Sequence, residues 1–172
     1  RQNAFMSMRL RDPIRAIAYF SQAHDLNEKD LVVINELSSL ILQIRQPISA
    51  EKIINKGLKL APNNLKLLYT KSDILHFKKE YRNVVSTISH AISLRDTAQY
   101  YQKMIGAAYL HLEQFDSCIY HLNEIIRKGK DSELTHYQLA LAFKGIGNLA
   151  QSEIEYQAAI KKGISENVGV YY

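Results

Sequence analysis

The sequence repeats itself at a constant shift of about 34 residues, and the repetition lies in the size of its side chains. One set of positions holds small or modest residues: Ala16, Ala50, Val84, Cys118 and Ser152. Four residues further along, every member of the next set is large: Phe20, Ile54, Ile88, Leu122 and Tyr156. A fixed period of this length is typical of a solenoid of helical hairpins, in which each hairpin buries its apolar face against its neighbours.

Within each period, apolar residues recur every three or four positions, which predicts short helices separated by turns. Asp12 followed by Pro13 supplies an N-cap and a first-turn proline, and Pro47 lies at a similar helix start. We expect helices over residues 1–10, 13–25, 31–44, 48–60, 65–78, 82–94, 98–111, 115–128, 133–145 and 149–162, with a further start at 167. The predicted fold class is all-α.

The first helix of each pair carries a small column of its own, made of Ser38, Ser72, Gly106 and Ala140. Three residues on, the side chains are large: Ile41, Leu75, Tyr109 and Phe143. The unit 99–132 shows the whole pattern best, with Gly106-Ala107-Ala108-Tyr109 followed by Phe115, Cys118, Leu122 and Ile125. This pattern resembles the tetratricopeptide repeat (TPR), a helix–turn–helix unit, and the resemblance covers essentially the whole chain.

The resemblance implies a right-handed superhelical solenoid of antiparallel helix pairs, with about five repeats in a single array over residues 1–172. The expected repeats are 1–30, 31–64, 65–98, 99–132 and 133–166, and residues 167–172 would begin a further helix. Lys71 departs from the family pattern because it stands at a normally apolar position. The constant period argues against the RNA-binding pentatricopeptide repeat, whose longer period would drift by one residue per repeat.

Both ends of the sequence suggest a piece of a longer array. The chain begins at Arg1 rather than Met, and the first unit has a shortened first helix. After Gly163 the sequence reads as the opening of another helix, whereas solenoids usually end in a capping helix with a polar outer face. We therefore expect further sequence on both sides.

Composition and charge restrict the classes of function. The chain has 22 Lys and Arg against 17 Asp and Glu, a net charge of +5 without a run of five or six like charges, so we expect no nucleic acid partner. No apolar stretch approaches the ~18 residues of a membrane span. The single cysteine excludes an internal disulfide and favours a cytoplasmic location. An exported or periplasmic location stays open because the N-terminus looks truncated.

In TPR proteins the first helix of each pair lines the concave inner face, where ligands usually lie. The resemblance therefore places a partner-binding groove at the positions of these helices that lie off the packing columns. The candidate groove residues are Lys66, Tyr69, Asp73, His76, Tyr100, Lys103, His111, Tyr137 and Lys144. Alternating tyrosines and lysines suit a protein or peptide ligand with apolar anchors and some acidic side chains. In an alternative interpretation, several of these tyrosines pack between neighbouring helices with only the hydroxyl exposed.

Nothing in the sequence indicates catalysis. The six histidines form no H-E-x-x-H pair and there is no cysteine cluster, so we expect neither a metal nor a cofactor. Cys118 lies in a small packing column, and we expect it to be buried and unreactive. The Lys, Asn and Arg set with which some TPR proteins clamp the C-terminal carboxylate of cytosolic chaperones is missing.

The sequence thus predicts a non-enzymatic protein–protein interaction module that binds a peptide or partner segment in the concave groove. Two alternatives stay open. The array could be a structural or assembly scaffold that self-associates through uncapped ends or its convex face. It could also be the recruitment region of a larger enzyme or envelope protein.

Overall fold

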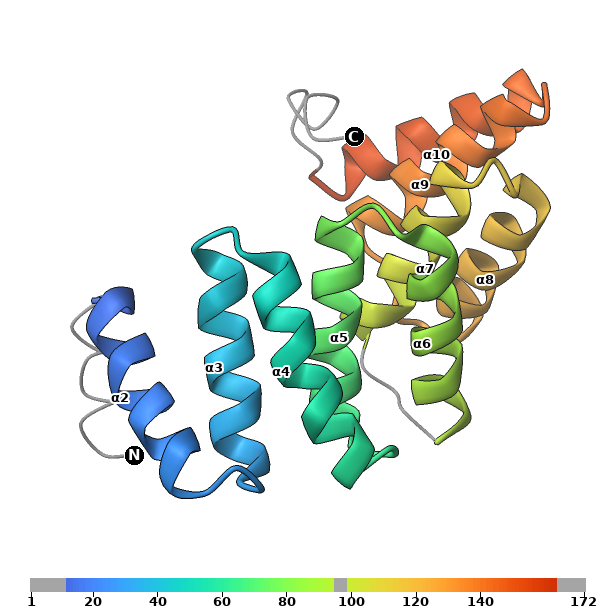
Figure 1. Ribbon diagram of the computed structural model, residues 1–172. Helices are drawn as coiled ribbons and strands as arrows, with labels where there is room; N and C mark the ends of the chain where they lie inside the picture. Colours follow the sequence, from blue (N-terminus) through green and yellow to red (C-terminus); the bar gives the residue numbers. More distant parts are fainter. Residues whose placement is uncertain (1–11, 95–98, 164–172) are drawn as a thin grey trace. The chain divides into compact units, whose positions relative to one another are not determined.

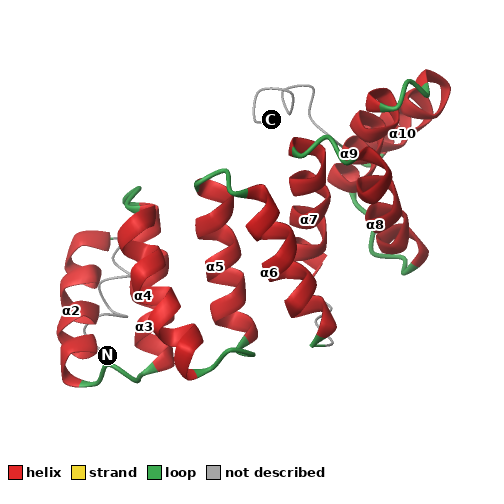
Figure 2. Ribbon diagram, turned by 45° about the vertical axis from the view of Figure 1, so that its right-hand side comes forward, coloured by secondary structure: helices red, strands yellow, loops and turns green. Residues whose placement is uncertain are grey.

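The computed structural model describes residues 12–94 and 99–163, and the side chains of residues 99–103 lie outside this description. All regular structure in this part of the chain is helical (Figure 1; Figure 2). The helices are α2 (Pro13–Leu26), α3 (Leu31–Gln43), α4 (Pro47–Leu60), α5 (Leu65–Phe77), α6 (Tyr81–Ser93), α7 (Gln99–His111), α8 (Phe115–Arg127), α9 (Glu133–Gly145) and α10 (Leu149–Lys161). We call α3, α5, α7 and α9 the A helices, and α2, α4, α6, α8 and α10 the B helices.

Helices of one kind begin at the same constant interval that the sequence predicts. The A helices begin at Leu31, Leu65, Gln99 and Glu133, and the B helices at Pro13, Pro47, Tyr81, Phe115 and Leu149. The predicted ranges from residue 13 to residue 162 agree with these bounds to within one residue, so the all-α repeat prediction is confirmed. The helices expected at 1–10 and from 167 lie outside the described residues.

The chain divides into two compact units, one of Arg1–Asn83 with His90–Asp96 and one of Val84–Ser89 with Thr97–Tyr172. In the first unit, α3 packs on α2, α4 and α5, and α4 also packs on α5. Figure 1 shows these four helices side by side in alternating directions. In the second unit, α8 packs on α7 and α9, and α9 packs on α7 and α10. A single array over residues 1–172 stays a prediction.

The predicted small columns are buried where the helices pack. Ala16, Ala50 and Cys118 have no exposed surface, and neither does Phe20, a member of the large column. A Cβ atom added at Gly106 on α7 would lie 2.7 Å from Leu122 Cδ2 on α8. A larger residue there would force the side chain of Leu122 to move, because protein interiors are close-packed. The small columns therefore set how closely the helices of a pair approach.

Serine replaces alanine in these columns because its hydroxyl finds an acceptor. Ser152 on α10 donates to the carbonyl of Ala140 on α9 at 2.8 Å. Ser38 donates to the carbonyl of Ile34, one turn earlier in α3, at 2.7 Å. A buried hydroxyl with a partner costs little, so size decides which residues fit.

Lys71, the departure from the apolar pattern, is satisfied by the preceding B helix. Its ammonium group donates to the carboxylate of Glu51 and, at 2.9 Å, to Oδ1 of Asn55, both on α4. Lys78 also pairs with Glu51. Burial raises the pKa of Glu51, but the two ammonium groups outweigh burial and the net pKa is lowered. An ion pair thus replaces an apolar contact between α4 and α5.

The turn from an A helix to the next B helix uses the same backbone conformation every time. Arg45, Lys79, Glu113 and Gly147 occupy the same position in successive repeats, and their φ angles are 60°, 61°, 55° and 78°. Positive φ is strained for any residue with a Cβ atom and free of strain for glycine. Of the four turns that the structure describes, only the last has glycine, the residue favoured at positive φ, at this position (Gly147).

Substitutions at two of these turns should have opposite effects on stability. Gly147→Ala should lower the free energy of unfolding by about 1 kcal/mol, because alanine adopts positive φ at a cost. Glu113→Gly should raise it by up to about 1 kcal/mol by removing the same strain. Urea unfolding followed by circular dichroism measures both. Changes of the same sign in the two variants would contradict the assignment of strain to this position.

Candidate functional site

The A helices of the first unit expose a mixed apolar and charged face. On α3 the residues that reach solvent recur at helical spacing, and the same positions of α5 follow one repeat later. We call this surface the A face, made of Val32, Glu36, Ser39, Lys66, Asp73 and Phe77. Val32 is 42% exposed and Phe77 is 44% exposed, so two apolar side chains are accessible on it.

A chain of hydrogen bonds joins α3 to α5 beside the A face. Thr70 donates to Oδ1 of Asn35 at 2.8 Å, and both side chains are buried. Asn35 donates in turn to Oε1 of Glu36 at 3.3 Å. Lys66 donates to the same Glu36 oxygen at 2.8 Å. The charge of Lys66 is therefore compensated from the neighbouring A helix.

Four of the predicted groove residues belong to the first unit. Lys66 and Asp73 lie on the A face. Tyr69 is half-buried, at the position equivalent to Asn35 one repeat earlier. His76 is half-buried and packs edge-to-face on Tyr81 of α6, with ring centroids 5.8 Å apart.

The other predicted groove residues belong to the second unit. His111 and Lys144 are exposed near the C-terminal ends of α7 and α9. Tyr137 is half-buried, and its ring packs edge-to-face on Tyr156 of α10 at 5.8 Å. The side chains of Tyr100 and Lys103 lie outside the described residues. One groove formed by all nine residues stays a prediction.

The side chains of Asn35, Tyr69 and Tyr137, which share one position of the repeat, lie next to contacts between helices and are not fully exposed to solvent. Asn35 is buried against α5, and both tyrosines are half-buried. These positions are consistent with the alternative in which tyrosines pack between helices. The exposed apolar residues Val32 and Phe77 are better candidates for ligand contact. Their signal in the sequence is their spacing, because each is an apolar residue off the packing columns of an A helix.

A polar cluster in the second unit surrounds His136 on α9. His136 Nε2 lies 2.9 Å from Oδ2 of Asp131, and its Nδ1 lies 2.8 Å from Oε2 of Glu155 on α10. Lys162 donates to the same Asp131 oxygen at 2.7 Å. Both ring nitrogens of His136 thus have a carboxylate within hydrogen-bond distance. His136 occupies a column that holds apolar residues in the first unit, and the carboxylates explain why it is tolerated there.

Groups suited to catalysis are scarce in the part of the chain that the structure describes. Cys118 is buried, and burial raises the pKa of its thiol to about 12, as expected for an unreactive packing residue. Within residues 12–94 and 99–163 no cluster of three or more His, Cys, Asp or Glu side chains could hold a metal ion. None of the helices described is long and apolar enough to cross a membrane.

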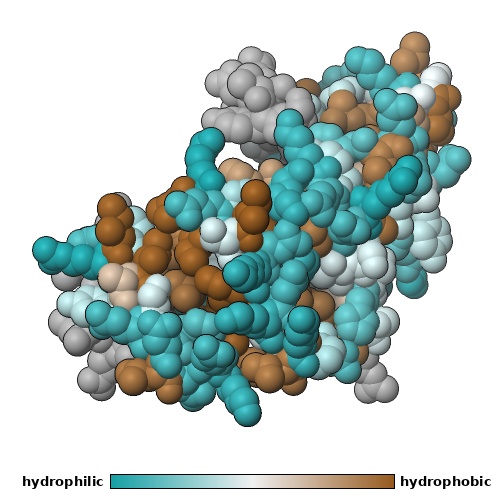
Figure 3. Space-filling model, viewed as in Figure 1, coloured by the Kyte–Doolittle hydropathy of each residue, from teal (hydrophilic) through white to brown (hydrophobic). Residues whose placement is uncertain are grey.

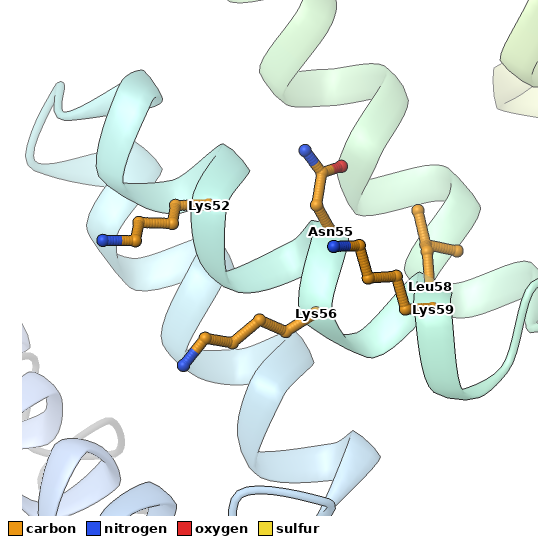
Figure 4. A pocket seen from close by; sticks show the side chains of 5 residues that line it. All are labelled: Lys52, Asn55, Lys56, Leu58 and Lys59. Carbon is orange, nitrogen blue, oxygen red and sulfur yellow. The ribbon is translucent and has the colours of Figure 1, made fainter.

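A second surface was not anticipated from the sequence and lies on α4. A hollow there is lined by Lys52, Asn55, Lys56, Leu58 and Lys59 (Figure 4). Lys52, Lys56 and Lys59 are exposed and are spaced four and three residues apart, which places them on one side of the helix. We call these three residues the α4 stripe. Their spacing was the available signal, although lysines on a helix surface are usually only solvated.

The repeated helix pairs define the fold of tetratricopeptide-repeat proteins. A solved MamA structure from Desulfovibrio magneticus RS-1 matches with a TM-score of 0.87 at 16% identity, over 95% of this chain and 93% of that chain. YrrB, described as a TPR protein with an unusual peptide-binding site, matches with a TM-score of 0.83 at 12% identity, over 98% of this chain and 87% of that one. A tetratricopeptide repeat protein from Parabacteroides merdae ATCC 43184 matches with a TM-score of 0.66 at 10% identity, over 96% and 64% of the two chains.

No protein-family model matches the sequence, and no curated protein matches it either. At identities this low, the likeness to solved structures establishes the fold and leaves the ligand open. The recognition of the repeat from the sequence is confirmed at the level of the fold.

The Asp131 cluster predicts a difference in acid stability. Lys162 and His136 lower the pKa of Asp131 from 3.8 to about 2. A carboxyl group with a lowered folded-state pKa stabilises the fold above its unfolded pKa, and this contribution disappears as pH falls through the folded value. Asp131→Asn should therefore lower the thermal midpoint at pH 7, and the difference from the unsubstituted protein should shrink between about pH 4 and pH 2.

Thermal unfolding at a series of pH values measures this effect. The matched control is Asp25→Asn, which removes an exposed acid of α2 that has no ion pair among the described residues. The control should change the midpoint little at any pH. A midpoint difference for Asp131→Asn that stays constant down to pH 2 would contradict the assignment.

Proposed function

We propose that this chain is a non-enzymatic protein-interaction module and that the A face binds a peptide or an extended segment of a partner. The observation that carries the proposal is the exposure of Val32 and Phe77 beside the hydrogen-bonded α3–α5 contact. Apolar side chains on a rigid helical support are typical anchors for a bound segment. The description of YrrB as a TPR protein with a peptide-binding site adds support by analogy of fold.

The register of the A helices predicts the length of the bound segment. Phe77 occupies the position in α5 that Gln43 occupies in α3, eleven residues beyond Val32. Eleven residues of helix extend about 16 Å along the axis, and packed helices lie about 9 Å apart, so the two anchors are separated by about 19 Å, which about six residues of extended peptide span. The middle of the A face is polar, and Lys66 there is already paired with Glu36. We therefore expect a segment with apolar residues near both ends and a polar centre; the acidic character predicted from the sequence is not required by the first unit.

Removing both apolar anchors should weaken peptide binding without unfolding the protein. Peptides selected from a displayed random library against the unsubstituted chain serve as probes, with affinity measured by fluorescence anisotropy. The double variant Val32→Ala, Phe77→Ala should bind them at least tenfold more weakly, since truncating an anchor typically costs more than about 1 kcal/mol. Both residues are exposed, so the helical circular dichroism should not change.

The matched control truncates two exposed apolar side chains of α2, Ile14→Ala and Leu26→Ala. These residues are 75% and 89% exposed and lie on a B helix, away from the A face. The control should keep full affinity. Equal weakening in both double variants, or full affinity in the A-face variant, would argue against this binding face.

A second candidate function, assembly of copies into a scaffold, is favoured by the last described helix. Ile160 on α10 is 58% exposed, whereas Leu58, Ile92 and Ile126 at the equivalent positions are only half-exposed. An exposed apolar residue at a position that is partly covered in the other repeats can pack against another copy of the chain.

Charge at this position should prevent self-association. Light scattering over a concentration series should show a mass that rises with concentration for the unsubstituted chain and stays monomeric for Ile160→Glu. Ala150→Glu adds the same charge at another exposed position of α10 and should associate like the unsubstituted chain. A monomeric mass at all concentrations for the unsubstituted chain would rule out assembly.

A further inference from the structure

The α4 stripe is a patch of positive charge without a compensating acid among residues 12–94 and 99–163. Neither Lys52, Lys56 nor Lys59 forms an ion pair with any residue that the structure describes. By contrast, two other lysines of the first unit do form ion pairs, Lys66 with Glu36 and Lys71 with Glu51.

The packing of α4 on α5 is what leaves the stripe uncompensated. Glu51 is the one acidic residue of α4 and directly precedes Lys52. Its carboxylate is held by Lys71 and Lys78, so it does not neutralise the stripe. Lys78 also pairs with Glu80, so these two lysines and two carboxylates balance one another and leave the charge of the stripe unchanged.

We propose that the α4 stripe docks an acidic segment of a partner protein. The three lysines rise by about 10 Å along α4, given 1.5 Å per residue. Carboxylates at alternate positions of an extended chain recur about every 6.8 Å on one side. Two or three such carboxylates therefore match the length of the stripe, and the long lysine side chains can adjust to their spacing.

Apolar surface lies beside the stripe at both of its ends, and it is most exposed at Ile48. Leu58 contributes to the hollow, and Figure 4 shows Lys52 and Lys56 extending to the same side of α4. Ile48 lies one turn before Lys52 and is 78% exposed. Figure 3 shows hydrophobic side chains gathered over the part of the first unit where α3 and α4 are joined. We expect the bound segment to carry an apolar residue next to its acidic run, at the end that meets Ile48.

The composition of the stripe favours a peptide over nucleic acid or lipid. Single-stranded nucleic acid is usually held by aromatic stacking and by arginine, and the stripe has neither. The apolar residues Ala50, Ile54 and Gly57 of α4 are buried and cannot insert into a membrane, so a membrane surface would gain mainly the contribution of the lysines, about 1 kcal/mol each. A protein segment can use the lysines and the apolar side chains together.

A charge-matched pair of triple variants tests the proposal in the full chain. The probe is a fluorescently labelled peptide with glutamate at alternate positions and one leucine at its end, followed by anisotropy at low salt. The variant Lys52→Gln, Lys56→Gln, Lys59→Gln should bind it about tenfold more weakly, as expected from three exposed ion pairs. The control Lys79→Gln, Lys128→Gln, Lys161→Gln removes the same charge from exposed sites elsewhere and should bind within about twofold of the unsubstituted chain.

Two further probes identify the occupant: a single-stranded oligouridylate and vesicles that contain phosphatidylserine. Preferential binding of the glutamate peptide, lost in the α4 triple variant and in a peptide with glutamine for glutamate, supports the proposal. Three results would overturn it: no binding of the peptide, equal loss in the control triple variant, or stripe-dependent preference for the oligonucleotide or the vesicles. The variant Val32→Ala, Phe77→Ala should keep full affinity for the glutamate peptide, so failure of the A-face proposal is distinguishable from failure of this one.

Discussion

The close approach of paired helices at their small columns is the constraint on which the rest of the structure depends. Gly106 lies so close to Leu122 that a single added carbon would not fit, and Ser152 bonds directly to the backbone of the preceding helix. Such contacts limit how the two helices of a pair can shift relative to each other. Because the helices recur at a constant interval, each hairpin presents its outer residues in the same register as the one before it. The A face and the α4 stripe both follow from this register.

Polar and charged residues can occupy positions of the repeat that are normally apolar when a neighbouring helix or turn supplies a hydrogen-bonding partner. Lys71 stands in a column that is otherwise apolar, and His136 in one that holds apolar residues in the first unit. Lys71 pairs with one carboxylate of a B helix, and His136 lies between a carboxylate of a B helix and one of an adjoining turn. Such pairs add little net stability over an apolar contact, since desolvation offsets much of the attraction. Their effect on the surface is larger. Because Glu51 pairs with Lys71 and Lys78, it does not pair with Lys52, Lys56 or Lys59 of the α4 stripe.

The sequence was sufficient to predict the helices because their signal is local and repeated. Each period supplies an independent estimate of the same boundaries, so an irregular residue such as Lys71 does not shift them. The binding surfaces were harder to predict because they depend on pairing between distant residues. Nothing local indicates that Lys66 is compensated by Glu36, thirty residues earlier, or that the equivalent positions Asn35 and Tyr69 lie beside a helix contact. Periodicity reveals which positions pack, and it leaves undetermined which of the remaining ones are free to bind.

The A face and the α4 stripe belong to the same packed unit but differ in what they can recognise. On the A face Lys66 is compensated by Glu36, so selectivity should come mainly from the apolar anchors and their spacing, and affinity should depend weakly on salt. The stripe has an uncompensated charge, so it should attract its ligand at longer range and lose affinity as ionic strength rises. Since α3, α4 and α5 pack on one another, the two surfaces are held at a fixed distance. A partner that carried both kinds of segment on one chain would bind the second after the first at a high effective concentration, which makes two individually weak contacts selective together.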